Sequence, residues 1–286
     1  MLGLFAFVWL ELAAPQPDSV TAVGWWLLGY VVVTAAGLVL FGTVWAERAD
    51  PFEVYSSLLA RLSPFGRDPS GAPVLRTPLH NLAASPVLPG SVALAATLLG
   101  STAFDSITAL PGWRDFVDSR SGGASFDATV IRTLGLLAVI AIVATVFTVA
   151  VRATGGLDRT ARAQLPGLLA HSITPIIAGY LIAHYLTLLV EQGQATLWLL
   201  ADPLRRGWNI GGLADHDVTY VLSTHPAVLA TLKVLAVLIG HILGVTAAHD
   251  RCLRLLPPAQ RATGQLALML VMVGFTFTGL YLLFGG

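Results

Sequence analysis

The sequence predicts an all-α fold, a polytopic transmembrane helical bundle that occupies residues 1–286 as a single domain. The composition is the first reason, because 55% of the residues are hydrophobic, only 11% are charged and the mean hydropathy is +0.75. Soluble domains lie far from these values. The second reason is that apolar windows long enough to cross about 30 Å of hydrocarbon recur along the whole chain.

Six apolar windows have the length of full membrane spans, and one further apolar segment is too short. The short segment, 2–14, has neither the basic start nor the cleavage site of a signal peptide. We therefore expect about seven membrane segments, six of them complete. The full spans are predicted at 22–45, 88–110, 129–152, 165–190, 226–248 and 262–284.

The arginines predict the orientation in the membrane. The loops after the first, third and fifth full spans carry ten arginines, whereas the alternating loops carry four, which are diluted by aspartates. The positive-inside rule then places the arginine-rich loops in the cytoplasm and the C-terminus outside. We expect a multi-pass protein of the bacterial cytoplasmic membrane, in contact with the lipid bilayer.

Two connections carry structural signals of their own. The stretch "DPFEVYSSLLARL" starts with Asp50 as a helix cap and Pro51 at the first helical position, which predicts a short interfacial helix over about 50–62 on the cytoplasmic side. The segment of about 192–225 is predicted to be a long outer loop.

Charge and cysteine content exclude two classes of function. Sixteen basic and sixteen acidic residues give a formal net charge of zero, so no basic surface indicates binding to nucleic acid. Cys252 is the single cysteine, which excludes an internal disulfide framework.

Ionisable side chains inside membrane spans usually mark a site or a pathway, and here they sort into two layers. The outer layer holds Asp105, His184 and Lys233 on three different spans, and Glu11 joins it if the first segment enters the membrane. The fourth full span carries one polar stripe at the spacing i, i+4, i+7 and i+11, formed by Tyr180, His184, Thr187 and Glu191.

The outer layer supports two interpretations. As a working site, it would bind a divalent metal ion through Asp105, His184, Glu191 and Glu11, with Asp105 and His184 as the catalytic pair. As a structural feature, it would be an ion pair between Asp105 and Lys233 with His184 hydrogen-bonded nearby.

The inner layer consists of His171, Thr174 and His241. Pro175 has no N–H to donate to the carbonyl of His171, so the helix is expected to kink there and to free that carbonyl. The thirteen-residue spacing between His171 and His184 also raises the possibility of a b-type haem site. Thirteen steps of 100° leave the two imidazoles about 140° apart on the helical wheel, which disfavours haem.

Four stretches together resemble a known family: "ERADPFEVYSSLLARLSPFGR", "LLGSTAFDSIT", "HSITPIIAGYLIAHYLTLLVEQGQ" with "DPLRRGW", and "GHILGVTAAHDR". The chain resembles, from about residue 40 to 285, the actinobacterial multi-pass membrane proteins labelled fenitrothion hydrolase. The resemblance implies hydrolysis of an organophosphate triester, and further spans before segment 2–14.

Three functions follow from these observations. The first is a metal-dependent hydrolase of lipophilic organophosphate esters. The second is an ion-coupled permease or a metal or proton transporter, for which a helix broken at Pro175 is typical. The third is a subunit of a larger membrane complex, which would supply a protein partner. The first two functions require a small lipophilic or ionic substrate.

Overall fold

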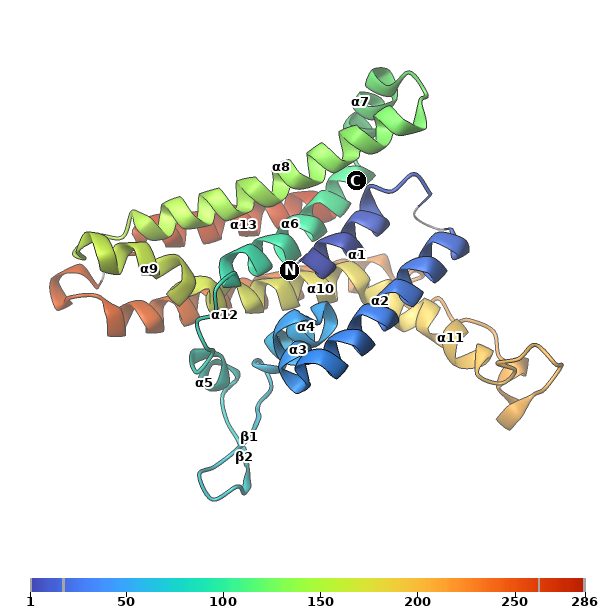
Figure 1. Ribbon diagram of the computed structural model, residues 1–286, viewed down its shortest axis with the longest axis horizontal. Coiled ribbons are helices and arrows are strands. Elements are labelled where there is room, and N and C mark those ends of the chain that lie inside the picture. The colour runs from blue at the N-terminus through green and yellow to red at the C-terminus, as the bar shows by residue number, and fades with distance from the viewer. Residues whose placement is uncertain (1, 17–18, 262, 285–286) are drawn as a thin grey trace.

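The chain is predominantly helical in the computed structural model, which describes residues 2–16, 19–261 and 263–284 (Figure 1). The α-helices are α1 (Leu2–Leu12), α2 (Val20–Phe41), α3 (Thr43–Ala49), α4 (Pro51–Ala60), α5 (Pro78–Ala83), α6 (Ser91–Ala109), α7 (Pro111–Ser121), α8 (Ser125–Arg152), α9 (Arg159–Leu169), α10 (Thr174–Thr187), α11 (Gly193–Leu199), α12 (Pro226–Leu255) and α13 (Leu266–Phe284). Short 3₁₀ turns, η1 (Ala170–Ile173), η3 (Ile210–Asp215) and η4 (Pro258–Gln260), and a π-helix, η2 (Leu188–Gln192), complete the helical part. The predicted all-α class is confirmed.

Among the described residues, six helical segments are long and apolar enough to cross a membrane, as predicted. They are α2, α6, α8, the run Arg159–Leu199 from α9 to α11, α12 and α13. Helix α1 has 11 residues, so it reaches only about 16 Å at 1.5 Å per residue. The short first segment is therefore confirmed as a helix that is too short to span the bilayer by itself.

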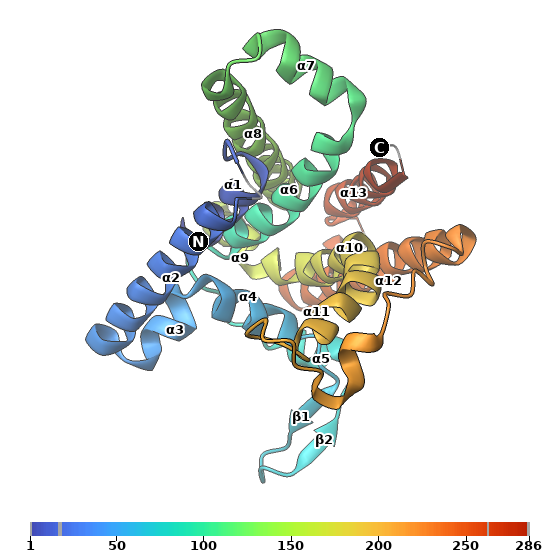
Figure 2. The same ribbon diagram turned by 90° about the vertical axis from the view of Figure 1, so that its right-hand side faces the viewer.

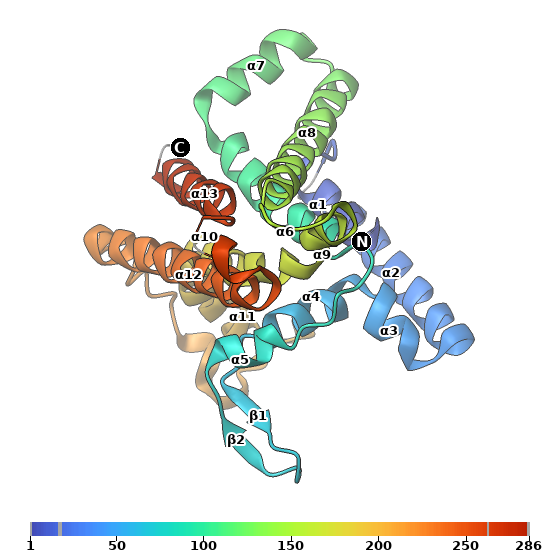
Figure 3. The ribbon, with the colours of Figure 1, turned by 90° about the vertical axis from the view of Figure 1, so that its left-hand side faces the viewer.

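The helices pack into an elongated bundle with peripheral elements. Helix α9 and the C-terminal end of α12 lie at one end, whereas α7 and α11 lie at the other (Figure 1). Helices α2 and α3 lie to one side of the bundle, and a small hairpin of β1 (Phe65–Arg67) and β2 (Pro73–Leu75) projects away from it (Figures 2 and 3). Much of the apolar surface of α2 is exposed, as expected for a helix that faces lipid.

Small residues bring α10 and α12 into close contact. A Cβ atom added at Gly179 would overlap the backbone of Ala236, and one added at Gly240 would overlap the carbonyl of Pro175. Gly244 likewise faces the carbonyl of Ser172. Because no side chain separates the two backbones, these helices form the tightest pair in the bundle, in the manner of small-residue interfaces between membrane helices.

The predicted interfacial helix is α4, and Asp50 fixes its start. The Asp50 carboxylate accepts hydrogen bonds from the N–H groups of Phe52 and Glu53, at 2.9 and 3.0 Å. Its second oxygen accepts from the hydroxyls of Tyr30, at 2.8 Å, and Thr34, at 3.4 Å. One carboxylate therefore caps α4 and ties it to the first full span.

The predicted break before Pro175 is present, but its consequence differs from the prediction. The chain forms the 3₁₀ turn η1 over Ala170–Ile173 before α10 begins. The N–H of Thr174 donates to the carbonyl of His171, three residues earlier. That carbonyl is not free, because a tighter turn supplies the donor that proline lacks.

The connections that the sequence predicts to lie outside contain more helix than it indicated. Helix α7 lies between the second and third full spans, and α11 with η3 occupies part of the predicted 192–225 loop. The fourth span therefore extends beyond its predicted end at 190, because the π-helix η2 and then α11 continue the helical run to Leu199.

Candidate functional site

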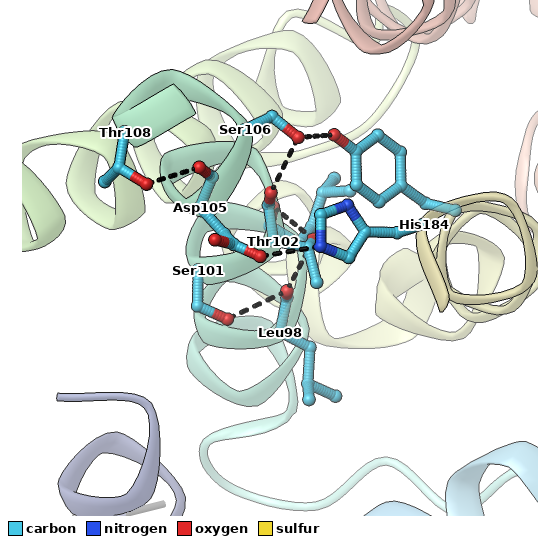
Figure 4. A network of polar contacts seen from close by, with 9 residues as sticks. Leu98, Ser101, Thr102, Asp105, Ser106, Thr108 and His184 are labelled. Atoms are coloured by element: carbon cyan, nitrogen blue, oxygen red, sulfur yellow. Dashed lines mark hydrogen bonds and ion pairs between the residues drawn. The ribbon is translucent and has the colours of Figure 1, made fainter. Parts of the chain in front are cut away.

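The central feature of the candidate site is a direct ion pair between two spans. His184 Nε2 of α10 lies 2.6 Å from Asp105 Oδ2 of α6, and the two side chains point toward one another (Figure 4). About a quarter of each side chain is exposed, 24% for His184 and 29% for Asp105. The pair thus joins residues that lie 79 positions apart in the sequence (184 − 105).

Two tyrosines orient the imidazole. The Tyr180 ring stacks on His184 with ring centres 6.1 Å apart, and the Tyr185 ring meets it edge-on at 4.8 Å. The Tyr180 hydroxyl shares a 2.5 Å hydrogen bond with Ser106 Oγ, on the residue after Asp105. Helix α10 is thus fastened to α6 twice, which limits the rotation of His184 and holds its Nε2 against the carboxylate.

The hydroxyls of α6 near Asp105 donate hydrogen bonds to carbonyls of the helix backbone. Ser101 donates to the carbonyl of Leu98 at 3.1 Å, and Thr108 donates to the carbonyl of Asp105 at 2.6 Å (Figure 4). Thr102 donates to the carbonyls one turn earlier. Among the described residues, none of these hydroxyls hydrogen-bonds to His184, so the pair is not extended into a serine–histidine–aspartate arrangement.

Glu11 of the short helix α1 belongs to the same neighbourhood. Its carboxylate lies within electrostatic range of Asp105 and His184 and near the Tyr185 side chain. Helix α1 is anchored beside α8 by the Trp9 indole, which donates to Thr133 Oγ1 at 2.9 Å. Helix α1 packs against α6 and α8 and so brings Glu11 close to the Asp105–His184 pair.

Glu191 lies outside this neighbourhood and has a structural role. Its side chain is 3% exposed and accepts hydrogen bonds from the N–H of Leu222, from the N–H of Ser223 and from the Ser223 hydroxyl, at 3.0, 2.8 and 2.7 Å. The predicted stripe assumed a regular α-helix. The π-helix η2 widens the turn over Leu188–Gln192 and changes the direction of every side chain after it.

Lys233 does not form the predicted structural pair. It lies half-buried on α12, and no ion pair joins it to Asp105 in the part of the chain that the structure describes. His184 is the partner of the Asp105 carboxylate instead.

The inner layer is buried and separate from the outer pair. His171 Nδ1 lies 3.1 Å from the carbonyl of Leu168, and His241 Nδ1 lies 2.8 Å from the carbonyl of Val237. The Nε2 atom of His241 is buried without a hydrogen-bond partner among the described residues. Thr174 is also buried, at the first turn of α10.

The metal prediction requires three or more converging ligands. Among the described residues, no group of three His, Cys, Asp or Glu side chains forms an arrangement that could hold a metal ion. Asp105 and His184 converge, but Glu191 is occupied by the backbone of Leu222 and Ser223. The bound divalent ion stays a prediction for metal analysis of the purified protein.

Comparison of the chain with protein-family models, curated proteins and solved structures finds no match. The class of protein is therefore defined by the fold and the site alone. The protein is a multi-span helical membrane protein, and a carboxylate–imidazole pair lies between its second and fourth full spans.

Proposed function

We propose that the protein is a proton-coupled membrane transporter in which Asp105 and His184 take up and release the coupling proton. The observation that carries the proposal is the 2.6 Å contact between His184 Nε2 and Asp105 Oδ2 on two different spans. Histidine is the side chain whose ordinary pKa lies nearest to neutral pH, and carboxylate–histidine chains are the usual proton relays of pumps and transporters.

The shape of the fourth span supports this function. His184 lies between two irregular turns, the 3₁₀ turn η1 on one side and the π-helix η2 on the other. Interrupted helices are typical of transporters, and π-turns occur frequently at functional sites. The segment that carries the imidazole can therefore move relative to α6 by small changes at either end.

Protonation provides the coupling in this proposal. With His184 protonated and Asp105 ionised, the pair attracts and holds α10 against α6. Loss of the proton removes the attraction and leaves the Asp105 carboxylate without its counter-charge. The two protonation states thus favour different arrangements of the helices, which is what a coupled carrier requires.

Flux measurements on reconstituted vesicles test the proposal. Wild type is compared with Asp105→Asn and His184→Gln, with Asp118→Asn on α7 as a control outside the pair. Proton movement is followed with a trapped pH-sensitive dye under an imposed potential, with and without a panel of small lipophilic ions. We expect both site variants to lose flux about tenfold or more, and the control to retain it.

One result of these flux measurements would contradict the proposal. Coupled flux that is the same in wild type, Asp105→Asn and His184→Gln would show that the pair is not a station for the proton.

A second candidate is hydrolysis of a lipophilic phosphoester, which the resemblance to the fenitrothion hydrolase family implies. The favouring observation is that Asp105 orients a partly exposed imidazole, the arrangement that activates a general base. Release of nitrophenol from an organophosphate triester by the same vesicles, lost in both variants and without ion flux, would support this candidate over transport.

A further inference from the structure

A cavity lies away from the Asp105–His184 pair. It has a volume of about 420 Å³, within the range of small-molecule sites, and lies where α4 faces the start of α6 and the turn η1. We propose that this cavity binds an anionic phospholipid, with the phosphate at Arg48 and Arg61 and an acyl chain in the apolar interior. The proposal does not depend on the transport function.

The walls of the cavity have the two parts that a lipid requires. Val54 and Leu58 of α4, Leu94 of α6 and Leu168 of α9 supply apolar side chains. Arg48 and Arg61 line the same cavity, at the C-terminal ends of α3 and α4. A single site thus offers cationic groups and a hydrocarbon surface, the combination that recognises an anionic amphiphile rather than a free ion.

Both arginines are available for a ligand. Neither guanidinium forms an ion pair or a hydrogen bond in the part of the chain that the structure describes. By contrast, Arg67 and Arg76 in the adjoining hairpin donate to backbone carbonyls of Gly71 and Arg67. Arginine is the preferred partner of phosphate because its planar fork can donate two parallel hydrogen bonds.

A buried hydroxyl supplies a second and independent indication. Ser85 lines this cavity, and its Oγ is shielded from solvent and has no hydrogen-bond partner among the described residues. Buried polar groups are normally satisfied, so an orphaned hydroxyl in a cavity wall indicates a missing partner. A phosphate or ester oxygen would accept its proton.

Charge and position favour a lipid of the inner leaflet. Two arginines and one glutamate, Glu47, line the cavity, so its formal charge is +1 with His171 neutral. The cavity lies at the arginine-rich end of the bundle, which the positive-inside rule predicts to be cytoplasmic. The anionic phospholipids of the cytoplasmic leaflet combine the negative phosphate and the acyl chains that such a cavity would bind.

Binding titrations of the full chain in neutral detergent test the proposal. The probes are short-chain phosphatidylglycerol, phosphatidylcholine with the same chains, and inorganic phosphate. We expect saturable binding of phosphatidylglycerol, at least tenfold tighter than that of the other two probes. Arg48→Gln and Arg61→Gln should each weaken it about tenfold, since each removes charge-assisted hydrogen bonds to the phosphate.

Matched variants separate specific binding from general charge and from misfolding. Arg205→Gln with Arg206→Gln removes two arginines from the opposite end and should leave binding unchanged. Glu47→Gln removes the acidic group of the cavity and should tighten binding about threefold, a gain that a misfolded protein cannot produce. Val54→Trp, which fills the apolar part of the cavity, should weaken the binding of phosphatidylglycerol but not that of inorganic phosphate.

Three results would overturn the proposal. Equal affinity for phosphatidylglycerol and phosphatidylcholine would remove the role of the arginines. Inorganic phosphate bound as tightly as the lipid would indicate a simple anion site. Equal losses in the Arg48→Gln with Arg61→Gln and the Arg205→Gln with Arg206→Gln double variants would indicate only nonspecific attraction.

Discussion

Three carboxylates connect different parts of this protein, and each does so through a different kind of contact. Asp105 pairs with an imidazole between two spans, Asp50 caps a helix, and Glu191 holds an outer loop. All three are at least partly withdrawn from water. Their hydrogen bonds and charges are therefore stronger than those of surface groups, and the loss of any one leaves donors unsatisfied.

Asp50 should contribute measurably to stability. Replacement by Ala removes the cap of α4 and the acceptor of the Tyr30 and Thr34 hydroxyls, at a cost of about 1–3 kcal/mol. Thermal unfolding in detergent should show a lower unfolding temperature for Asp50→Ala. The decrease should be smaller for Tyr30→Phe, which removes one of the four hydrogen bonds. Unfolding of Asp50→Ala at the wild-type temperature would contradict the role of the cap.

The same carboxyl predicts a pH dependence. Burial raises the pKa of Asp50, but the hydrogen bonds to its carboxylate outweigh burial, so the pKa lies below its ordinary value in the folded protein. The carboxylate thus stabilises the fold above the unfolded value of about 3.9, and this contribution is lost as the pH falls through the folded value. Asp50→Asn should therefore lose less stability than wild type as the pH falls, because it has no carboxylate to protonate at this position. Identical dependence of stability on acid pH in wild type and Asp50→Asn would refute this prediction.

Glu191 should fix the outer loop. Glu191→Ala leaves the N–H groups of Leu222 and Ser223 without their acceptor, at a cost of about 1–3 kcal/mol. Tryptic cleavage at Arg205 and Arg206, in the same loop, should become faster. Glu53→Ala is the control, because Glu53 is exposed and, among the described residues, its carboxylate accepts only from the Ser57 hydroxyl. Equal cleavage of the two variants would show that Glu191 is dispensable.

At the scale of the elements, backbone contact between α10 and α12 positions the site. His184 lies on α10, whose opposite face is fixed against α12 by Gly179 and Gly240. A side chain at either glycine would push the helices apart, and α10 would carry His184 with it. The precision of the Asp105–His184 contact thus depends on residues that do not touch it.

Gly240→Ala should therefore be destabilising although alanine favours helix. Its Cβ would overlap the carbonyl of Pro175, and overpacking of this kind costs about 1–3 kcal/mol. Gly274→Ala on α13 is the matched control, because nothing lies within 4 Å of its added Cβ, and it should be neutral or stabilising by up to about 1 kcal/mol. Equal unfolding temperatures of the two variants would exclude close packing as the reason for Gly240.

For the whole molecule, the orientation is testable by cysteine accessibility. Leu75 in the hairpin and Leu204 in the outer loop are both exposed, whereas the native Cys252 is buried and gives little background. If the arginine-rich end is cytoplasmic, a membrane-impermeant maleimide should label Leu204→Cys in intact cells and Leu75→Cys only after lysis. The reverse pattern would invert the predicted topology and place the C-terminus inside.

The sequence predicted regular features well and irregular ones poorly. The six spans and the cap of α4 follow from composition and local spacing, and both are present. Glu191 was predicted beside His184 because the helical wheel assumes a constant turn, and the π-helix η2 breaks that assumption. The role of Tyr185 was missed; its only signal was an aromatic residue directly after His184.

The sequence by itself determined that the protein is a helical membrane protein and which of its buried side chains can be charged. Hydropathy and residue type are local properties, and the bilayer forces every apolar stretch of sufficient length into a helix. Which of those charged groups meet was decided only by the tertiary structure. The pairing of Asp105 with His184 rather than Lys233, the approach of Glu11 and the diversion of Glu191 all depend on helix rotation and on irregular turns, which packing between distant segments sets.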